Sequence, residues 1–203
     1  MDCIGDRLRS SISSGHLMGF IIVSAAYVLC LGLTVFFVTP AQRQVLPEIT
    51  VFASLIYLPH GVRVLATWAY GWKAIPALIA GSVIAAFVFF PDAKLEFLTP
   101  ALFASVLYGA VTAYIAFELV RLIHRDYYFG NAQKPSWKGM IVIGAIASII
   151  NSIGQTLIFS GLIDLDKFVF ILVTYAIGDL VGLILCMAAL MIIFRWIRLN
   201  AKS

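Results

Sequence analysis

Two charged side chains lie deep inside long apolar segments of this sequence, where ionisable residues are rare. Counted from the segment ends, Arg63 and Asp179 fall toward the middle, Asn151 and Gln155 lie at similar depth, and Glu118 lies near one end. A charge at the centre of a membrane-spanning helix costs about 2.5–3.5 kcal/mol on insertion scales, so it is normally paired, hydrated or functional. These residues are therefore the first candidates for a binding or ion-pairing centre.

The sequence around Arg63 predicts a break in its helix. Pro59 and Gly61 stand within the run Tyr57-Leu58-Pro59-His60-Gly61-Val62-Arg63. Proline lacks the amide for a helical hydrogen bond and glycine lowers the cost of a bend, so the chain should kink or unwind here. A half-helix beginning near His60 would direct its free amides and Arg63 at one patch suited to a carboxylate, a phosphate or a polarised carbonyl. Alternatively, Pro59 only kinks a packed helix, Arg63 is a structural ion-pair member and His60 is an ordinary interior residue.

The last apolar segment offers a counter-charge for Arg63. Gly178 and Gly182 are four residues apart and let a neighbouring helix approach closely, so Asp179 should face protein, with Tyr175 one turn earlier on the same face. We predict that Asp179 pairs with Arg63.

A polar stripe on the preceding segment completes the predicted centre. Ser148, Asn151 and Gln155 recur at three- and four-residue spacing. The predicted ligand-binding residues are His60, Arg63, Asn151, Gln155, Tyr175 and Asp179, with Pro59, Gly61, Gly178 and Gly182 as structural motif residues. The alternative is that each polar stripe only holds helices together.

These residues must be positioned by membrane helices, because 62% of the 203 residues are apolar, only 12% are charged and the mean hydropathy is +1.01. A bilayer core about 30 Å thick requires roughly 20 apolar residues of helix, and unpaired backbone groups are not tolerated in lipid. We therefore predict an all-α, polytopic bundle of about six transmembrane helices, the second broken near Pro59 to Gly61. The single integral membrane domain covers 1–203, with helices at approximately 17–38, 46–72, 74–90, 98–122, 140–162 and 168–194.

The distribution of Lys and Arg predicts the orientation of these helices. With the N-terminus inside, ten basic residues fall on the cytoplasmic side and three on the other, and Arg63 lies within a span. The positive-inside rule therefore predicts a multi-pass membrane protein with both termini cytoplasmic. The net charge of +4 indicates attraction to anionic lipid headgroups rather than to nucleic acid.

The sequence contains none of the patterns expected of an enzyme or of a cofactor protein. Walker, Rossmann, HExxH and GxSxG patterns are missing, and His60, His124 and Glu118 are too scattered to form a catalytic set. Cys3, Cys30 and Cys186 are not spaced as a zinc cluster or a disulfide framework. We therefore expect no catalytic residue, no metal and no cofactor.

Three motifs carry a resemblance to a known family. The run Ile56-Tyr57-Leu58-Pro59-His60-Gly61-Val62-Arg63-Val64-Leu65 is followed by Tyr70-Gly71-Trp72-Lys73-Ala74-Ile75-Pro76, and Gly178-Asp179 with Gly182 occurs in the last segment. This pattern resembles the first family of bacterial membrane-associated sensor domains. The resemblance implies a sensor-like module of the bacterial inner membrane that responds to a small ligand or a membrane state. Larger members of that family have more spans and continue into a signalling domain, whereas this chain stops at Ser203, so the output is expected from a membrane or cytoplasmic protein partner.

Two other classes fit the size of the chain. Six helices in about 200 residues are similar to the substrate-binding membrane subunits of vitamin and small-solute transporters, which dock on an energising complex. The third class is a structural accessory subunit of a larger membrane complex, in which Trp68, Trp72, Trp137 and Trp196 would be belt anchors. A co-purifying ATPase pair would favour transport, a co-purifying signalling protein would favour sensing, and a stoichiometric place in a respiratory or photosynthetic complex would favour the accessory role.

Overall fold

The structure is a computed structural model that describes residues 2–45, 54–90, 100–123, 125–131, 136–159 and 165–201, with the side chains of 2–14 and 165–168 outside this set. Every regular element among these residues is helical. The α-helices and two short turns of other helix types are α1 (Asp2–Leu33), the π-helical η1 (Thr34–Val38), α2 (Thr39–Val45), α4 (Leu58–Tyr70), the 3-10 turn η2 (Gly71–Lys73), α5 (Ala74–Phe89), α6 (Pro100–Leu122), α7 (Trp137–Ile158) and α8 (Leu165–Asn200).

Five described helical runs are long and apolar enough to cross a membrane, and the predicted all-helical fold is confirmed. The count of six is not confirmed. One of the five runs, Leu58–Phe89, consists of α4 and α5 joined through Gly71, which has a φ of 59°. With 13 residues, α4 is about 20 Å long, which is too short to cross a core of about 30 Å by itself.

The predicted second helix, 46–72, is helical only in its second half as far as the structure describes it. Residues 54–57 are not helical, and α4 begins at Leu58 with Pro59 in its first turn, where a missing amide costs no helical hydrogen bond. The predicted break near Pro59 and Gly61 is therefore confirmed as a helix start. Residues 46–53 lie outside the described residues.

Close contacts fix the directions of the first helices. Along α1 and α5, Ser24 bonds to the carbonyl of Ala77 and Gly32 lies against Phe89, so the two helices run parallel. Along α1 and α4, Gly19 lies against Tyr70 and Tyr27 bonds to Arg63, so these two run antiparallel. Consequently α4 and α5 form a helical hairpin rather than one continuous span.

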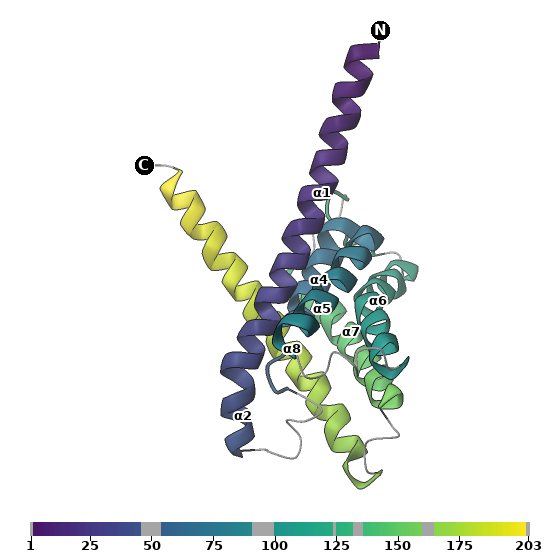
Figure 1. The fold of residues 1–203 in the computed structure, drawn as a ribbon, viewed down its shortest axis with the longest axis vertical. Helices are drawn as coiled ribbons and strands as arrows, with labels where there is room; N and C mark the ends of the chain where they lie inside the picture. The colour runs from purple at the N-terminus through teal and green to yellow at the C-terminus, as the bar shows by residue number, and fades with distance from the viewer. Residues whose placement is uncertain are drawn as a thin grey trace.

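Two apolar clusters hold the bundle together. One joins α4, α6, α7 and α8 through Val64, Phe117, Ile143, Ala147 and Leu183, among others. The other joins α1, α4, α5 and α6 through Val23, Tyr27, Val62, Ala77, Leu78 and their neighbours. Both clusters include α4, so this short helix lies at the centre of the bundle (Figure 1).

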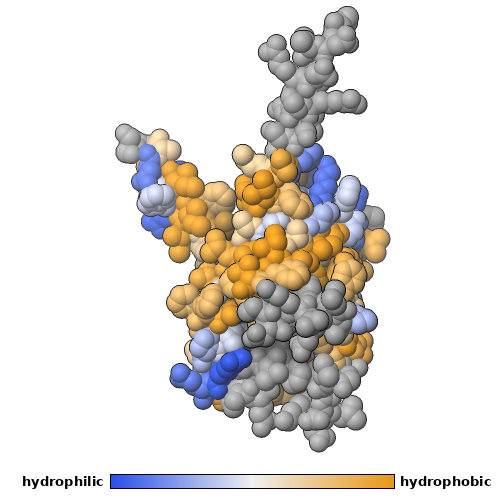
Figure 2. Space-filling model, viewed as in Figure 1, coloured by the Kyte–Doolittle hydropathy of each residue, from blue (hydrophilic) through white to orange (hydrophobic). Residues whose placement is uncertain are grey.

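The N-terminal part of α1 and the C-terminal part of α8 project from the same end of the bundle (Figure 1). Apolar side chains cover much of the described surface in this view, with separate polar patches above and below them (Figure 2). Large apolar residues of α8 such as Met191, Ile192 and Phe194 are exposed, as expected for a lipid-facing surface. These features are compatible with an integral membrane protein, whereas the cytoplasmic location of the two ends stays a prediction.

Candidate functional site

The start of α4 is held by an extended segment that lies directly against α8. The amide of Tyr57 donates to the carbonyl of Gly178 at 2.9 Å. A Cβ atom at Gly178 or Gly182 would overlap the carbonyl oxygen of Ser54 or Tyr57, respectively. The predicted close approach of a neighbouring helix is found at Gly182, which the start of α4 meets, whereas the neighbour of Gly178 is non-helical backbone.

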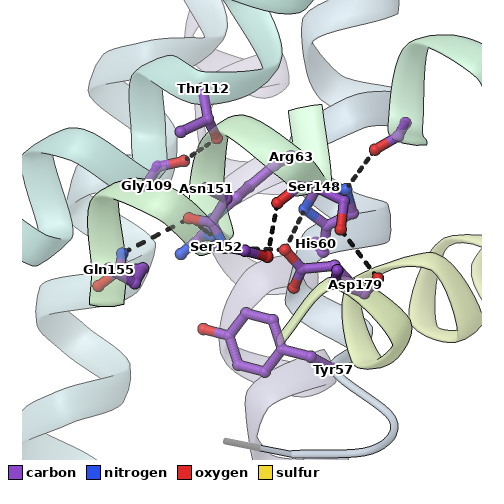
Figure 3. A network of polar contacts seen from close by, with 12 residues as sticks. Tyr57, His60, Arg63, Gly109, Thr112, Ser148, Asn151, Ser152, Gln155 and Asp179 are labelled. Atoms are coloured by element: carbon purple, nitrogen blue, oxygen red, sulfur yellow. Dashed lines mark hydrogen bonds and ion pairs between the residues drawn. The ribbon is translucent and has the colours of Figure 1, made fainter. Parts of the chain in front are cut away.

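Asp179 and His60 meet at the centre of the bundle. Their side chains are almost completely buried, and His60 Nδ1 lies 3.3 Å from Asp179 Oδ2. The other ring nitrogen of His60, Nε2, lies 3.3 Å from the carbonyl oxygen of Gly144. Asn151 Nδ2 donates to Asp179 Oδ2 at 2.8 Å. Figure 3 shows these side chains converging from α4, α7 and α8.

Arg63 is bound by neutral partners rather than by the predicted carboxylate. Its Nη1 donates to Asn151 Oδ1 at 3.4 Å and its Nη2 donates to the hydroxyl of Tyr27 at 3.0 Å. The guanidinium also lies 5.7 Å from the ring centre of Tyr27 and 5.5 Å from that of Tyr57. Arg63 and Asp179 do not form a direct ion pair among the described residues. The predicted direct pair is replaced by a bridge, because the amide of Asn151 offers an acceptor to Arg63 and a donor to Asp179.

The polar stripe on α7 connects three helices. Gln155 exchanges two hydrogen bonds with Ser105 of α6, at 2.7 Å from the serine hydroxyl and 3.1 Å to the serine carbonyl. Its Nε2 also lies 3.5 Å from Asn151 Oδ1. Ser148 donates to the carbonyl of Ala176 on α8 at 2.9 Å. Most of this stripe therefore holds helices together, as its alternative interpretation stated, while Asn151 also orders the charged groups.

A cavity of about 220 Å³ lies beside this centre, between the later turns of α1 and η1, the start of α6, the end of α7 and the first turns of α8. Four of the predicted residues line it, namely Arg63, Asn151, Gln155 and Tyr175, whereas His60 and Asp179 lie behind its wall. The remaining lining residues are Leu31, Thr34, Val35, Thr39, Ser54, Tyr57, Phe90, Ser105 and Phe159. The cavity therefore occupies the half of the bundle farther from the N-terminus of α1.

The predicted patch of free helix amides does not face this cavity. The amide of Leu58 lies near Gly182 of α8, and the amide of His60 donates to the carbonyl of Tyr57 at 3.2 Å. From α4 itself, Arg63 is the residue that reaches the cavity. The side chain, and not the helix terminus, is thus the charged group available there.

Sequence reasoning missed Tyr27, Tyr57, Ser105 and Gly109. Tyr27 is a polar aromatic residue in the middle of an apolar run, away from the span ends where tyrosine usually occurs, and this was a usable signal. Gly109 leaves space for Arg63, because a Cβ there would lie 2.7 Å from Nη2. Nothing in the sequence around Gly109 indicates that role.

The described residues contain no group of three or more His, Cys, Asp or Glu side chains that could hold a metal ion. Comparisons of the chain with protein-family models, with curated proteins and with solved structures find no match.

Proposed function

We propose that this chain is a non-enzymatic integral membrane module that binds a small ligand in the cavity beside Arg63 and transmits its binding to a protein partner. The observation that carries the proposal is the cavity itself, about 220 Å³ in volume and lined by a buried cation and several polar side chains. Such pockets, concave and mainly apolar with a few placed polar groups, are the usual form of ligand sites.

Polar side chains inside a membrane protein raise its free energy unless they have hydrogen-bond partners. Arg63 is only 5% exposed, and its Nε has no hydrogen-bond partner among the described residues. A purely structural arginine would be expected to have its donors satisfied, because an unpaired buried donor costs about 1–3 kcal/mol. Arg63 also lines the cavity, so an occupant could accept hydrogen bonds from the part of its guanidinium that faces the cavity.

The position of the cavity supports a sensing role. Its wall includes Tyr57 and Tyr175, which come from the extended segment before α4 and from α8. These two segments are joined by the hydrogen bond from Tyr57 to Gly178 and by the close approach at Gly182. A ligand that moves Tyr57 or Tyr175 would therefore alter the contact between α4 and α8, and α8 continues beyond the bundle (Figure 1). The resemblance to membrane-associated sensor domains favours the same function.

The test is whether small molecules are retained by the purified protein in a cavity-dependent manner. Val35→Trp would fill the cavity without removing a side-chain hydrogen bond, and Phe37→Trp would place the same ring on the exposed side two residues later. We expect mass spectrometry after mild extraction to find a small molecule bound to wild type and Phe37→Trp but lost from Val35→Trp. Equal retention by both variants would contradict ligand binding in this cavity.

The sensing step has a separate measurement. Spin labels at the exposed positions Ile21 of α1 and Ile193 of α8 would report the distance between the two projecting helices. We expect the retained molecule to change that distance in wild type and to leave it unchanged in Val35→Trp. Binding without such a change, together with a co-purifying ATPase pair, would instead assign the chain to solute transport.

A further inference from the structure

The imidazole of His60 lies between two oxygen atoms. Nε2 lies 3.3 Å from the carbonyl oxygen of Gly144, and Nδ1 lies 3.3 Å from Asp179 Oδ2 without forming a hydrogen bond. A carbonyl oxygen can only accept, so Nε2 must carry a proton. Asp179 thus contacts His60 and Asn151, and among the described residues it forms no contact with Arg63.

Arg63 is left with a full positive charge. Its hydrogen-bond partners, Asn151 and Tyr27, are neutral. A guanidinium has five N–H donors, and the two hydrogen bonds of Arg63 use two of them. Three donors, including the buried Nε, have no acceptor among the described residues. Arg63 therefore has more donors than the described residues have acceptors for it.

The described part of the cavity wall adds a free donor but no acidic side chain. None of the described residues that line it is Asp or Glu, and Arg63 is its charged member. The side-chain amides of Asn151 and Gln155 already bond to protein groups. The hydroxyl of Tyr175 has no hydrogen-bond partner among the described residues and is available to donate. An occupant would thus meet free donors and a positive charge.

We propose, building on the function proposed above, that the ligand is a small anion, most simply a carboxylate, held by the free donors of Arg63 and by the hydroxyl of Tyr175. Arginine suits this role because its planar fork can bind both oxygens of a carboxylate. The volume of about 220 Å³ is below the roughly 300–1,000 Å³ of pockets for drug-sized ligands, so the anion has only a few carbon atoms. The apolar wall at Leu31, Val35 and Phe159 accommodates a short hydrocarbon body.

The test compares acetate with its neutral isostere acetamide on the full chain in phosphatidylcholine nanodiscs. Ionic strength is held constant with a bulky sulfonate buffer, whose anion is too large for the cavity. We expect acetate in the millimolar range to raise the unfolding temperature saturably by roughly 2–4 °C, and acetamide to have no such effect. Equal stabilisation by acetamide, or no saturable effect of acetate, would overturn the anion assignment.

Matched variants locate the effect. Arg63→Gln is expected to weaken the apparent affinity for acetate at least about tenfold. The reason is that it removes a charge-assisted hydrogen bond, which contributes at least that factor to binding. Arg43→Gln removes an exposed arginine of α2 that does not line the cavity, and it should respond like wild type. If Arg63→Gln does not fold, Val35→Trp replaces it, because filling the cavity should abolish the response. An undiminished acetate response in Val35→Trp would contradict the proposed site.

A second nanodisc composition identifies the source of the anion. If phosphatidylglycerol stabilises wild type but not Val35→Trp, and acetate competes with it, the natural anion is a lipid headgroup. If phosphatidylglycerol has no cavity-dependent effect while acetate does, it is a free solute. Either result supports an anionic ligand.

The anion assignment and the proposed function fail in different ways. A neutral molecule that is retained by wild type and lost from Val35→Trp would leave ligand binding intact and refute the anion. If acetate stabilises the protein through Arg63 while the spin-label distance between the two projecting helices does not change, the anion assignment is supported and the sensing role is contradicted.

Discussion

This protein has one buried and one surface group of charged residues, and the two groups stabilise their charges by different contacts. At the end of α6, Arg121 forms direct ion pairs with Glu118 at 3.4 Å and with Asp126 at 3.7 Å, and all three side chains are at least one-third exposed. In the centre of the bundle, Arg63 and Asp179 are almost fully buried and are joined through Asn151 instead. For the two arginines, direct pairing with an acid thus occurs where water already screens the charges.

The difference follows from the dielectric environment. Exposed ion pairs contribute about 0–1 kcal/mol because water competes for both partners, so their geometry can vary without consequence. A buried charge must have hydrogen bonds from fixed neighbours, and losing one partner is strongly destabilising. The buried group should therefore be intolerant of substitution while the exposed group tolerates it.

The largest effect is expected at Asp179. Asp179→Ala removes the acceptor of Asn151 and the counter-charge beside His60. We expect a loss of about 3–5 kcal/mol in the free energy of unfolding, measured by denaturant titration in lipid nanodiscs. Asp126→Ala is the matched control at the surface, and it should cost only about 1 kcal/mol, because it removes an exposed pair and one turn hydrogen bond.

A double-mutant cycle sharpens this contrast. Although Arg63 and Asp179 do not touch, both bond to Asn151, so their substitutions should be non-additive by about 0.5–3 kcal/mol. Strict additivity would show that the amide bridge transmits no coupling. Similar losses for Asp179→Ala and Asp126→Ala would mean that burial does not distinguish the two groups.

A smaller effect is expected where α8 meets the extended segment. In Gly178→Ala, the new methyl group would overlap the backbone carbonyl of Ser54, which cannot rotate away as a side chain can. We expect a cost of about 1–3 kcal/mol in the same titration and a weakened response of the spin-label distance to ligand. Gly15→Ala on α1 is the control, since its methyl group meets nothing within 4 Å and helix propensity favours alanine by about 0.5–1 kcal/mol. Equal stability of wild type and Gly178→Ala would show that the close contact is adjustable.

The sequence was sufficient to predict the all-helical fold with apolar helices long enough to span a membrane, the helix start near Pro59 and four of the residues that line the cavity. Each of these depends on local chemistry: the length of apolar runs, the missing amide of proline and the rarity of polar groups at depth. The bridge by Asn151 and the space at Gly109 could not be predicted, because they depend on the relative rotation and depth of separate helices. Spacing placed Arg63 and Asp179 at similar depth, but it contained no information about which side chain stands between them.

The smallest effect is expected at Tyr128, in the connection between α6 and α7, where the surface group meets the bundle. Partial burial and its hydrogen bond to Glu118, 2.9 Å long, raise the pKa of Tyr128 well above its ordinary value. Above pH about 10 the unfolded chain releases this proton first while the folded chain still holds it, so stability falls as the pH rises. Tyr128→Phe has no such proton and should lose less stability than wild type between about pH 9 and pH 11.

Unfolding temperatures across that pH range provide the measurement, and Tyr127→Phe is the control, because the Tyr127 hydroxyl contacts Arg125 rather than an acid. We expect the unfolding temperature of Tyr127→Phe to follow that of wild type across this pH range and that of Tyr128→Phe to fall less. This result would show that the surface group includes one contact whose strength depends on partial burial. If the Tyr128→Phe profile were as steep as that of wild type, the contact with Glu118 would belong with the screened ion pairs of Arg121. Water would then screen every charge contact of the surface group, and unscreened charges would be confined to the buried centre.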